Sequence, residues 1–183
     1  MDKANLKITE VTLNLLKNKD WSNLKLVEVK NKSNVKNFDK IVKDKKSLLK
    51  FINQYFDYRL LLDSKKIEIS NNKDMIFEIL MMRFDLLQIY RKQILSIYKS
   101  FQNKPKNLLF LLPALLDSII YMVSLTNISD KGLLGRAKIK GIFIVYIASF
   151  FVWIKDDTDS LEKTMTSLDN NLNQADKILQ FLS

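Results

Sequence analysis

The chain has 183 residues, with three glycines, two prolines, no cysteine and no histidine. The two missing residue types exclude disulfides, zinc fingers, thiolate nucleophiles and histidine general bases. No nucleophile, base and orienting group can be assembled from the rest, so we expect no enzyme, metal or cofactor. The net charge is +10, of which residues 1–50 carry +7 (13 Lys against 6 Asp/Glu), and this imbalance predicts an N-terminal segment that meets an anion.

Two apolar stretches, 108–125 and 141–154, are candidates for membrane spans. The second has 14 residues, fewer than the ~20 that a span requires. The first contains Pro113 and Asp117 near its middle, and a charge is costly there. No signal peptide is visible at the N-terminus. We therefore expect a cytoplasmic protein without an integral membrane span.

The first part of the chain predicts three short helices and a longer fourth. Apolar side chains at helical spacing place them at 3–18, 23–29, 35–42 and 45–62. A polar turn is expected at 31–34, and Asp44 is placed to cap the fourth helix. In a lysine-rich segment this is the outline of a helix-turn-helix module. The alternative is a solvated basic face on a small helical bundle.

The rest of the chain also predicts helices, so the fold class is all-α. After a polar connector at 63–73 we place them at 74–87, 91–101, 103–125, 138–154 and 159–182. The helix over 103–125 is expected to bend at Pro113, where the ring removes a hydrogen bond. Asp159 and Glu162 have the spacing of a capping box for the last helix. Their carboxylates, with those at 156 and 157, are interpreted as helix capping and not as a metal site.

Asp117 lies within an apolar helix, where an unpaired carboxylate is costly to bury. With Arg83 and Tyr121 it would line a ligand pocket and fix a polar group in an apolar cavity. The alternative is an ion pair with Arg83 or Arg136, or a half-exposed position.

The last two predicted helices are expected to form a dimer interface. The stretch 141–154 is apolar on every face, so it needs more partners than one neighbouring helix supplies. The last helix carries an apolar seam, 161–182, with alternating spacings of four and three, as in a coiled coil. A second copy is the simplest partner. The expected contact residues are Phe150, Trp153, Leu161, Met165, Leu168 and Leu172.

Four stretches carry a family resemblance: 8–21, 43–49, 75–85 and 161–172. The first is a helix that ends at Trp21, and the second is a polar pair, lysine and leucine at the start of a helix. Of the last two, 75–85 is a mostly apolar helical segment and 161–172 is a helical segment with an apolar stripe. Together they resemble the TetR/AcrR family of bacterial transcriptional regulators, and the last two look like the regulatory domain of a proteobacterial subgroup.

The resemblance implies a TetR-like fold with a helix-turn-helix domain over 1–46 and a ligand-binding and dimerisation domain over 47–183. It implies a homodimer that binds double-stranded DNA and responds to an apolar small molecule or lipid. The DNA contacts would come from Lys25, Lys36, Asn37, Lys40 and Lys45.

The sequence departs from the family in the helix that would read DNA. The segment 36–41 is about two residues short, lacks the family's Gly and Tyr, and places Asp39 toward the phosphates. The alternative is therefore a lipid- or isoprenoid-binding protein that has lost the reading of DNA, like the proteins of this fold in ubiquinone biosynthesis. The short helix favours this alternative. The charge of the first 50 residues and the lack of those proteins' C-terminal membrane helix favour the regulator.

Overall fold

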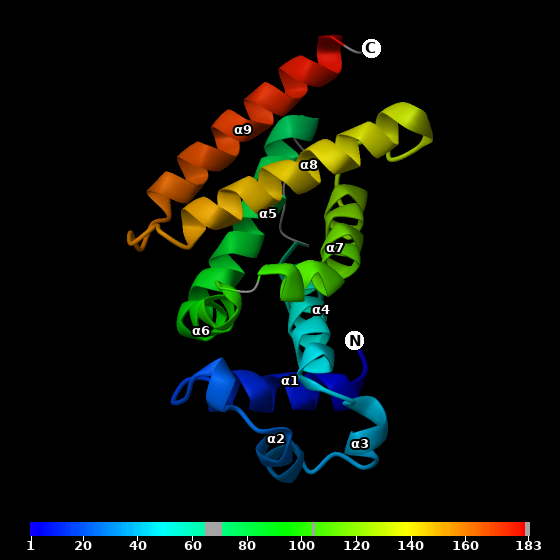
Figure 1. The fold of residues 1–183 in the computed structure, drawn as a ribbon. Helices are drawn as coiled ribbons and strands as arrows, with labels where there is room; N and C mark the ends of the chain where they lie inside the picture. Colours follow the sequence, from blue (N-terminus) through cyan, green and yellow to red (C-terminus); the bar gives the residue numbers. More distant parts are fainter. Residues whose placement is uncertain (65–70, 104, 182–183) are drawn as a thin grey trace. The chain divides into compact units, whose positions relative to one another are not determined.

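The computed structural model describes residues 1–64, 71–103 and 105–181, and every regular element in these ranges is a helix (Figure 1). The expected all-α class is confirmed. The elements are α1 (Lys3–Leu15), η1 (Trp21–Asn23), α2 (Leu26–Ser33), α3 (Phe38–Ile41), α4 (Lys45–Asp63), α5 (Asn72–Ile89), α6 (Arg91–Phe101), η3 (Pro105–Leu111), α7 (Leu112–Ser124), α8 (Gly132–Trp153) and α9 (Glu162–Phe181), where η marks a 3-10 helix.

The helices form two compact units that are interleaved along the chain. Unit 1 comprises Met1–Arg59 and Leu86–Leu115, and unit 2 comprises Leu60–Asp85 and Leu116–Ser183. Since the divisions fall inside helices, α4, α5 and α7 each contribute residues to both units. The expected domain boundary at residue 46 falls within unit 1.

In unit 1, α1 packs against α2, and α6 packs against η1. The amide of Trp21 donates a hydrogen bond to Ser96 Oγ at 2.8 Å, and the side-chain amide of Gln93 donates to the Leu13 carbonyl at 3.5 Å. Trp21 is buried to 3% exposure, and Ile8 and Leu16 are fully buried. The second segment of unit 1 therefore completes the core of the first.

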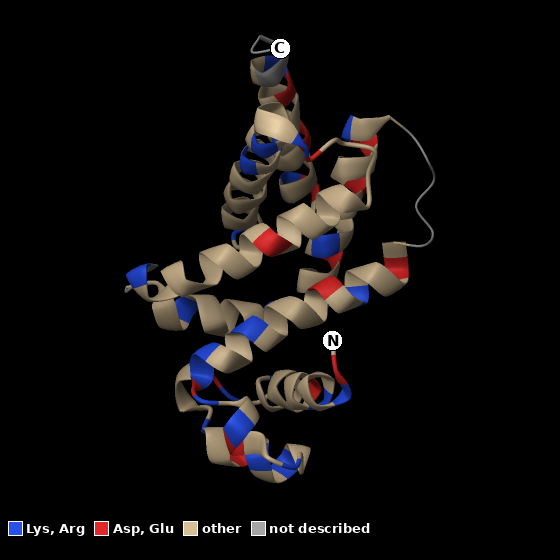
Figure 2. Cartoon of the chain, turned by 90° about the vertical axis from the view of Figure 1, so that its right-hand side faces the viewer, with Lys and Arg blue, Asp and Glu red and all other residues tan. Residues whose placement is uncertain are grey.

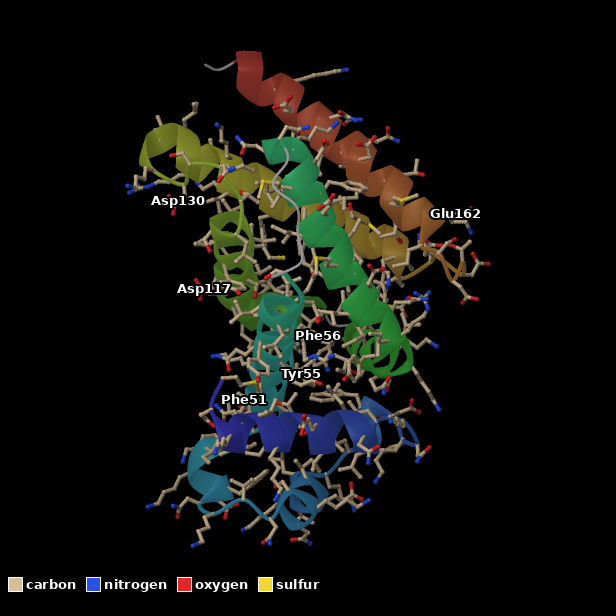
Figure 3. The ribbon with its side chains drawn as sticks, turned by 180° about the vertical axis from the view of Figure 1, so that it is seen from behind. Phe51, Tyr55, Phe56, Asp117, Asp130 and Glu162 are labelled. Atoms are coloured by element: carbon tan, nitrogen blue, oxygen red, sulfur yellow. The ribbon has the colours of Figure 1, made fainter. Side chains whose placement is uncertain are left out.

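Three aromatic rings join α4 to the break between α5 and α6. Tyr55, Phe56 and Tyr90 meet edge to face with centroids 5.6–5.9 Å apart (Figure 3 labels the first two). The Tyr55 and Tyr90 hydroxyls lie 2.9 Å apart, and Arg59 donates to Tyr55. Burial and the hydrogen bond with Tyr55 raise the pKa of Tyr90 to about 12, so the Tyr90 hydroxyl stays neutral at physiological pH. This cluster fixes α4 within unit 1.

Several sequence-based boundaries are wrong: among them, the helix expected at 3–18 ends at Leu15 and the one expected at 35–42 is only Phe38–Ile41. Three further differences have clear causes. The expected polar turn at 31–34 is mostly helix, because α2 continues to Ser33 and turns only at Asn34, which takes a left-handed φ of 47°. The expected bent helix over 103–125 is instead η3 followed by α7. Pro113 lies in the first turn of α7, where its missing N–H costs nothing.

The third difference is the start of α8, which begins six residues before residue 138, at Gly132. Gly132 has a φ of 70°, a conformation that favours glycine. At Gly135 an added Cβ would lie 2.2 Å from the carbonyl carbon of Asp130, so the chain approaches the helix too closely for any side chain. These two glycines mark the start of α8.

In unit 2, α8 and α9 pack side by side along their lengths (Figure 1). α8 buries one stripe, formed by Gly135, Ile139, Ile142, Val145, Tyr146, Ser149 and Trp153. α9 buries Thr164, Leu168 and Leu172, and Leu161 is buried just before its start, whereas Met165 is 43% exposed. The expected seam is therefore displaced by one residue at this point. Its last positions, 179 and 182, lie outside the side chains that the structure describes.

The expected capping box of Asp159 with Glu162 is wrong, and Asp156 with Thr158 replaces it. One oxygen of the Asp156 carboxylate accepts from the Thr158 amide and hydroxyl at 3.2 and 2.7 Å. The other accepts from the Thr164 amide and hydroxyl at 2.8 and 2.7 Å. The Thr158 hydroxyl in turn accepts from the Glu162 amide at 3.1 Å. Both residues thus satisfy backbone donors at the start of α9.

Asp156 is fully buried. Burial by itself would raise the pKa of its carboxyl, but the hydrogen bonds from Thr158 and Thr164 outweigh it and lower the pKa to about 2. Leu161 adopts a left-handed φ of 56° while its side chain is 1% exposed. The connection between α8 and α9 is therefore held by a buried carboxylate and a buried leucine.

Candidate nucleic-acid interface

The net positive charge of the chain is confined to unit 1. Its two segments contain 19 Lys/Arg and 7 Asp/Glu, a net charge of +12. Unit 2 contains 11 Lys/Arg and 13 Asp/Glu, a net charge of −2. Figure 2 shows the lysines in blue along the N-terminal helices. Unit 1 is therefore the part of the molecule suited to an anionic partner.

The segment α2–turn–α3 presents the lysines of a helix-turn-helix outline. Asn34 and Asn37 both take left-handed conformations, with φ of 47° and 59°, and so shape the turn between the helices. α3 is a single turn of four residues, held by Phe38, which is 3% exposed. Lys36, Asn37 and Lys40 are exposed around it, as is Lys32 on α2.

The acidic side chains of this segment are engaged by lysines. Lys30 Nζ lies 2.5 Å from the Asp39 carboxylate, and Lys19 Nζ lies 2.6 Å from that of Glu28. The hydrogen bond from Lys19, together with that from the Lys25 amide, lowers the pKa of Glu28. Asp39, expected to oppose the phosphates, thus has its charge offset by Lys30. The exposed lysines on both sides of α3 remain to meet an anion.

The side chain of Lys45 makes its contacts within unit 1. Its Nζ donates to the carbonyls of Trp21 and Ser22 at 2.6 and 3.1 Å and lies 5.4 Å from the Trp21 ring centroid. Burial lowers the pKa of its ammonium group. Two of the three N–H donors of its ammonium group are used by carbonyls, so Lys45 is less available for a phosphate than the exposed lysines. Lys25, by contrast, is exposed at the start of α2.

Comparison with known proteins identifies the fold. No family model and no curated protein sequence matches the chain. A solved TetR transcriptional regulator from Nitrosomonas europaea ATCC 19718 is similar in structure, with a TM-score of 0.73 and 16% sequence identity over 96% of this chain and 99% of that one. The chain has a TetR-like fold. The likeness covers both units.

The residues expected to bind a ligand do not share one environment in this TetR-like fold. Asp117 is exposed on α7 (Figure 3), so its carboxylate is solvated and does not line an apolar pocket. Arg83 on α5 is 1% exposed, and Tyr121 is half-buried. A cavity of about 140 Å³ in unit 2 is lined by other residues, among them Lys73 and Lys138.

Most of the expected dimer contacts are buried inside the chain itself. Trp153 and Leu168 are fully buried, and Leu161 and Leu172 are 1% and 5% exposed. These four side chains have almost no surface to offer a second copy, because they are buried within the protomer. Of the six expected contact residues, Met165, which is 43% exposed, and the half-buried Phe150 have surface that a second copy could contact.

Sequence reasoning missed the apolar surface of α8 that faces away from this core. Ile144 is 67% exposed and Phe151 is 51% exposed, and their spacing of seven places them on one helix face. Gly141 lies on the same face, and an added Cβ there meets no atom within 4 Å. An exposed apolar stripe at this spacing was hidden in the sequence, because the whole of 141–154 is apolar.

Proposed function

We propose that the protein is a dimeric, cytoplasmic regulator of transcription that binds double-stranded DNA through unit 1. The observation that carries the proposal is the set of exposed lysines around α3, in a unit with a net charge of +12. In a helix-turn-helix the second helix enters the major groove, and lysines beside it hold the phosphates. The TetR-like fold supports this assignment.

The short α3 determines how such binding works. One helical turn offers few side chains to base edges, and Lys36, Asn37 and Lys40 are the exposed ones. Phosphate contacts supply affinity and register, whereas base contacts supply specificity. Binding is therefore dominated by the backbone of the duplex and weakens steeply with salt.

Lys36→Ala/Lys40→Ala tests the assignment. We expect a large loss of affinity for duplex DNA from upstream of the protein's own gene, and a salt slope shallower by about 2, because two phosphate contacts are removed. Fluorescence anisotropy over a salt series measures both. Lys99→Ala is the matched control, since Lys99 is an exposed lysine of unit 1 in the last turn of α6. Unchanged binding in the double variant, or equal binding to a scrambled duplex, would contradict the proposal.

The second copy of the dimer packs against the outer face of α8 in this proposal. Ile144 and Phe151 supply apolar surface, and Gly141 allows a close approach of a partner helix. Met165 on α9 extends the same kind of surface. A dimer brings two copies of the basic unit 1 to one duplex, so dimerisation raises the affinity for DNA.

Ile144→Glu is expected to convert the dimer to a monomer, because it places a charge in the centre of the apolar face. Size-exclusion chromatography with light scattering gives the mass. Leu133→Glu is the control: Leu133 is 87% exposed at the start of α8, and its replacement leaves the mass unchanged. A variant Ile144→Glu that remains dimeric would place the interface elsewhere.

A lipid- or isoprenoid-binding protein is the second candidate, and two observations favour it. α3 is reduced to four residues, and Lys45 is occupied by carbonyls of its own chain. A protein that no longer reads DNA tolerates both. In either candidate an apolar ligand in unit 2 would shift the population of one conformation over another. The two candidates differ in DNA binding. The second is favoured if mass spectrometry finds a copurifying lipid and the protein binds its own upstream duplex no better than a scrambled one.

A further inference from the structure

The segment from η3 into α7 exposes an unusual amount of apolar surface. Leu109 is 56% exposed and Leu112 is 40% exposed. Among the described residues, Lys106–Ser124 is long and apolar enough, by length and composition, to cross a membrane. Yet only 22% of its most apolar 18-residue stretch is buried. A core helix of this hydropathy is mostly buried. Contiguous exposed apolar surface of this kind marks a site of interaction.

A membrane span does not explain the segment. It changes from a 3-10 helix to an α-helix at Leu112, contains Pro113, and places the exposed carboxylate of Asp117 near its middle. A charge at that depth in a bilayer is costly. The apolar side chains therefore belong to a surface and not to a span.

Two contacts hold this segment along α4 within unit 1. Lys46 Nζ lies 5.2 Å from the ring centroid of Phe110, and the side-chain amide of Asn53 donates to the Ala114 carbonyl at 3.2 Å. Positions 46, 50 and 53 share one face of a helix. Lys50, which is exposed, therefore lies on the α4 face that borders the segment, and Lys106 is exposed within η3 itself.

The sequence that leads into the exposed leucines carries only positive charges. Residues 86–116 contain no aspartate or glutamate. The cations in that range are Arg91, Lys92, Lys99, Lys104 and Lys106. Lys46, Lys50 and Lys106 place positive charge beside the exposed leucines, and the carboxylates of Asp57 on α4 and Asp117 on α7 lie farther along these helices. Apolar side chains within a rim of lysines match the interface of an anionic bilayer, where leucines enter the acyl boundary and lysines meet the headgroups.

We propose that Leu109, Leu112, Lys46, Lys50 and Lys106 form a lipid-docking surface that attaches unit 1 to an anionic membrane surface. The occupant is a bilayer because charge and hydropathy are complementary at once: a phosphate-bearing polymer would leave the leucines in water, and a second copy of this surface would bring lysines against lysines. The proposal is independent of DNA binding, since it uses none of the residues around α3.

Leu109→Trp provides a direct test. The two native tryptophans, Trp21 and Trp153, are 3% and 0% exposed and give a constant background. Vesicles of phosphatidylcholine mixed with phosphatidylglycerol are expected to shift the emission of the new tryptophan to shorter wavelength, and brominated acyl chains are expected to quench it. Vesicles of phosphatidylcholine alone are expected to do neither at physiological salt.

A cosedimentation assay with the same mixed vesicles measures affinity. All variants carry Lys36→Ala/Lys40→Ala, which reduces the attraction of vesicles to the lysines around α3. The assay uses no DNA, so its outcome does not depend on whether the protein is a regulator of transcription. In that background Leu109→Ser/Leu112→Ser is expected to weaken binding about tenfold or more, and Lys46→Gln/Lys50→Gln several-fold. Leu133→Ser, at an exposed leucine of unit 2, is the control and is expected to bind like its parent.

Three results would overturn the proposal. The first is absence of binding to mixed vesicles. The second is equal binding by the leucine double variant, which would mean attraction by charge alone. The third is a reduced oligomer mass in Leu109→Ser/Leu112→Ser without any vesicle binding by its parent, which would mean that a second copy covers this surface. Both leucines are exposed, so circular dichroism of the variants is expected to match the wild type and to exclude misfolding as the cause.

Discussion

Asp156→Ala is expected to lower the free energy of unfolding by about 3 kcal/mol. The substitution removes an acceptor of four hydrogen bonds and leaves the buried amide and hydroxyl of Thr164 without it. Each buried donor left unsatisfied costs about 1–3 kcal/mol. Urea denaturation followed by far-UV circular dichroism measures the change.

Asp159→Ala is the matched control for this prediction. Asp159 is exposed in the same connection and is the cap that the sequence pattern predicts. Its removal is expected to change stability by less than about 0.5 kcal/mol, as at other exposed positions without structural contacts. Equal losses in the two variants would show that Asp156 does not hold the start of α9.

The same carboxylate gives the stability a defined pH dependence. The pKa of Asp156 is about 2 in the folded protein, against an ordinary value of 3.8. A lowered pKa means that the ionised form stabilises the fold, so its contribution is complete above about pH 4 and is lost as the pH falls toward 2. The stability difference between the wild type and Asp156→Asn is therefore expected to shrink across this range. A difference independent of pH would contradict the assignment.

Trp153→Ala is expected to cost about 3–5 kcal/mol of stability, because it removes the largest kind of side chain from a closely packed core. The side chain is fully buried and stacks on Phe150 with ring centroids 5.5 Å apart. Its loss leaves a cavity between α8 and the rest of unit 2. Urea denaturation followed by circular dichroism measures the loss, and the fluorescence of Trp21, the remaining tryptophan, reports on unit 1 separately.

Phe151→Ala tests whether an exposed residue of α8 stabilises the dimer and not the fold of the protomer. Phe151 is the neighbour of a half-buried Phe150 in sequence but is 51% exposed. Its truncation is expected to change the unfolding of the protomer by less than about 1 kcal/mol and to weaken the dimer instead. If Trp153→Ala alters only the oligomer mass and not the stability of the protomer, Trp153 is an interface residue, as the sequence pattern predicts.

Local chemistry was predicted well from the sequence. Asp44 caps α4 as expected, accepting from the Ser47 amide at 2.9 Å. The helical spacing located most of the helices, because it depends only on residues within a few turns. The carboxylate cluster around Asp156 predicts capping, but it does not indicate the specific partners, since the Thr164 donors lie eight residues away and beyond the spacing of a capping box.

The misses concern contacts between distant residues. Lys45 meets the carbonyl of a residue 24 positions earlier, and no local pattern indicates that its charge is used there. The apolar stretch 141–154 gave no means of deciding which face packs within the chain and which is exposed, because nearly every position is hydrophobic. Trp153 is fully buried and Ile144 is 67% exposed, and only the tertiary packing distinguishes them.

The interleaving of the two units restricts how such a chain is cut or recombined. A fragment that ends at residue 46 or 59 lacks Ser96 and Gln93, which hold Trp21 and the end of α1. Such a fragment is therefore not an independently folding domain. Transferring unit 1 to another protein would require both of its segments, 1–59 and 86–115, and not one contiguous piece.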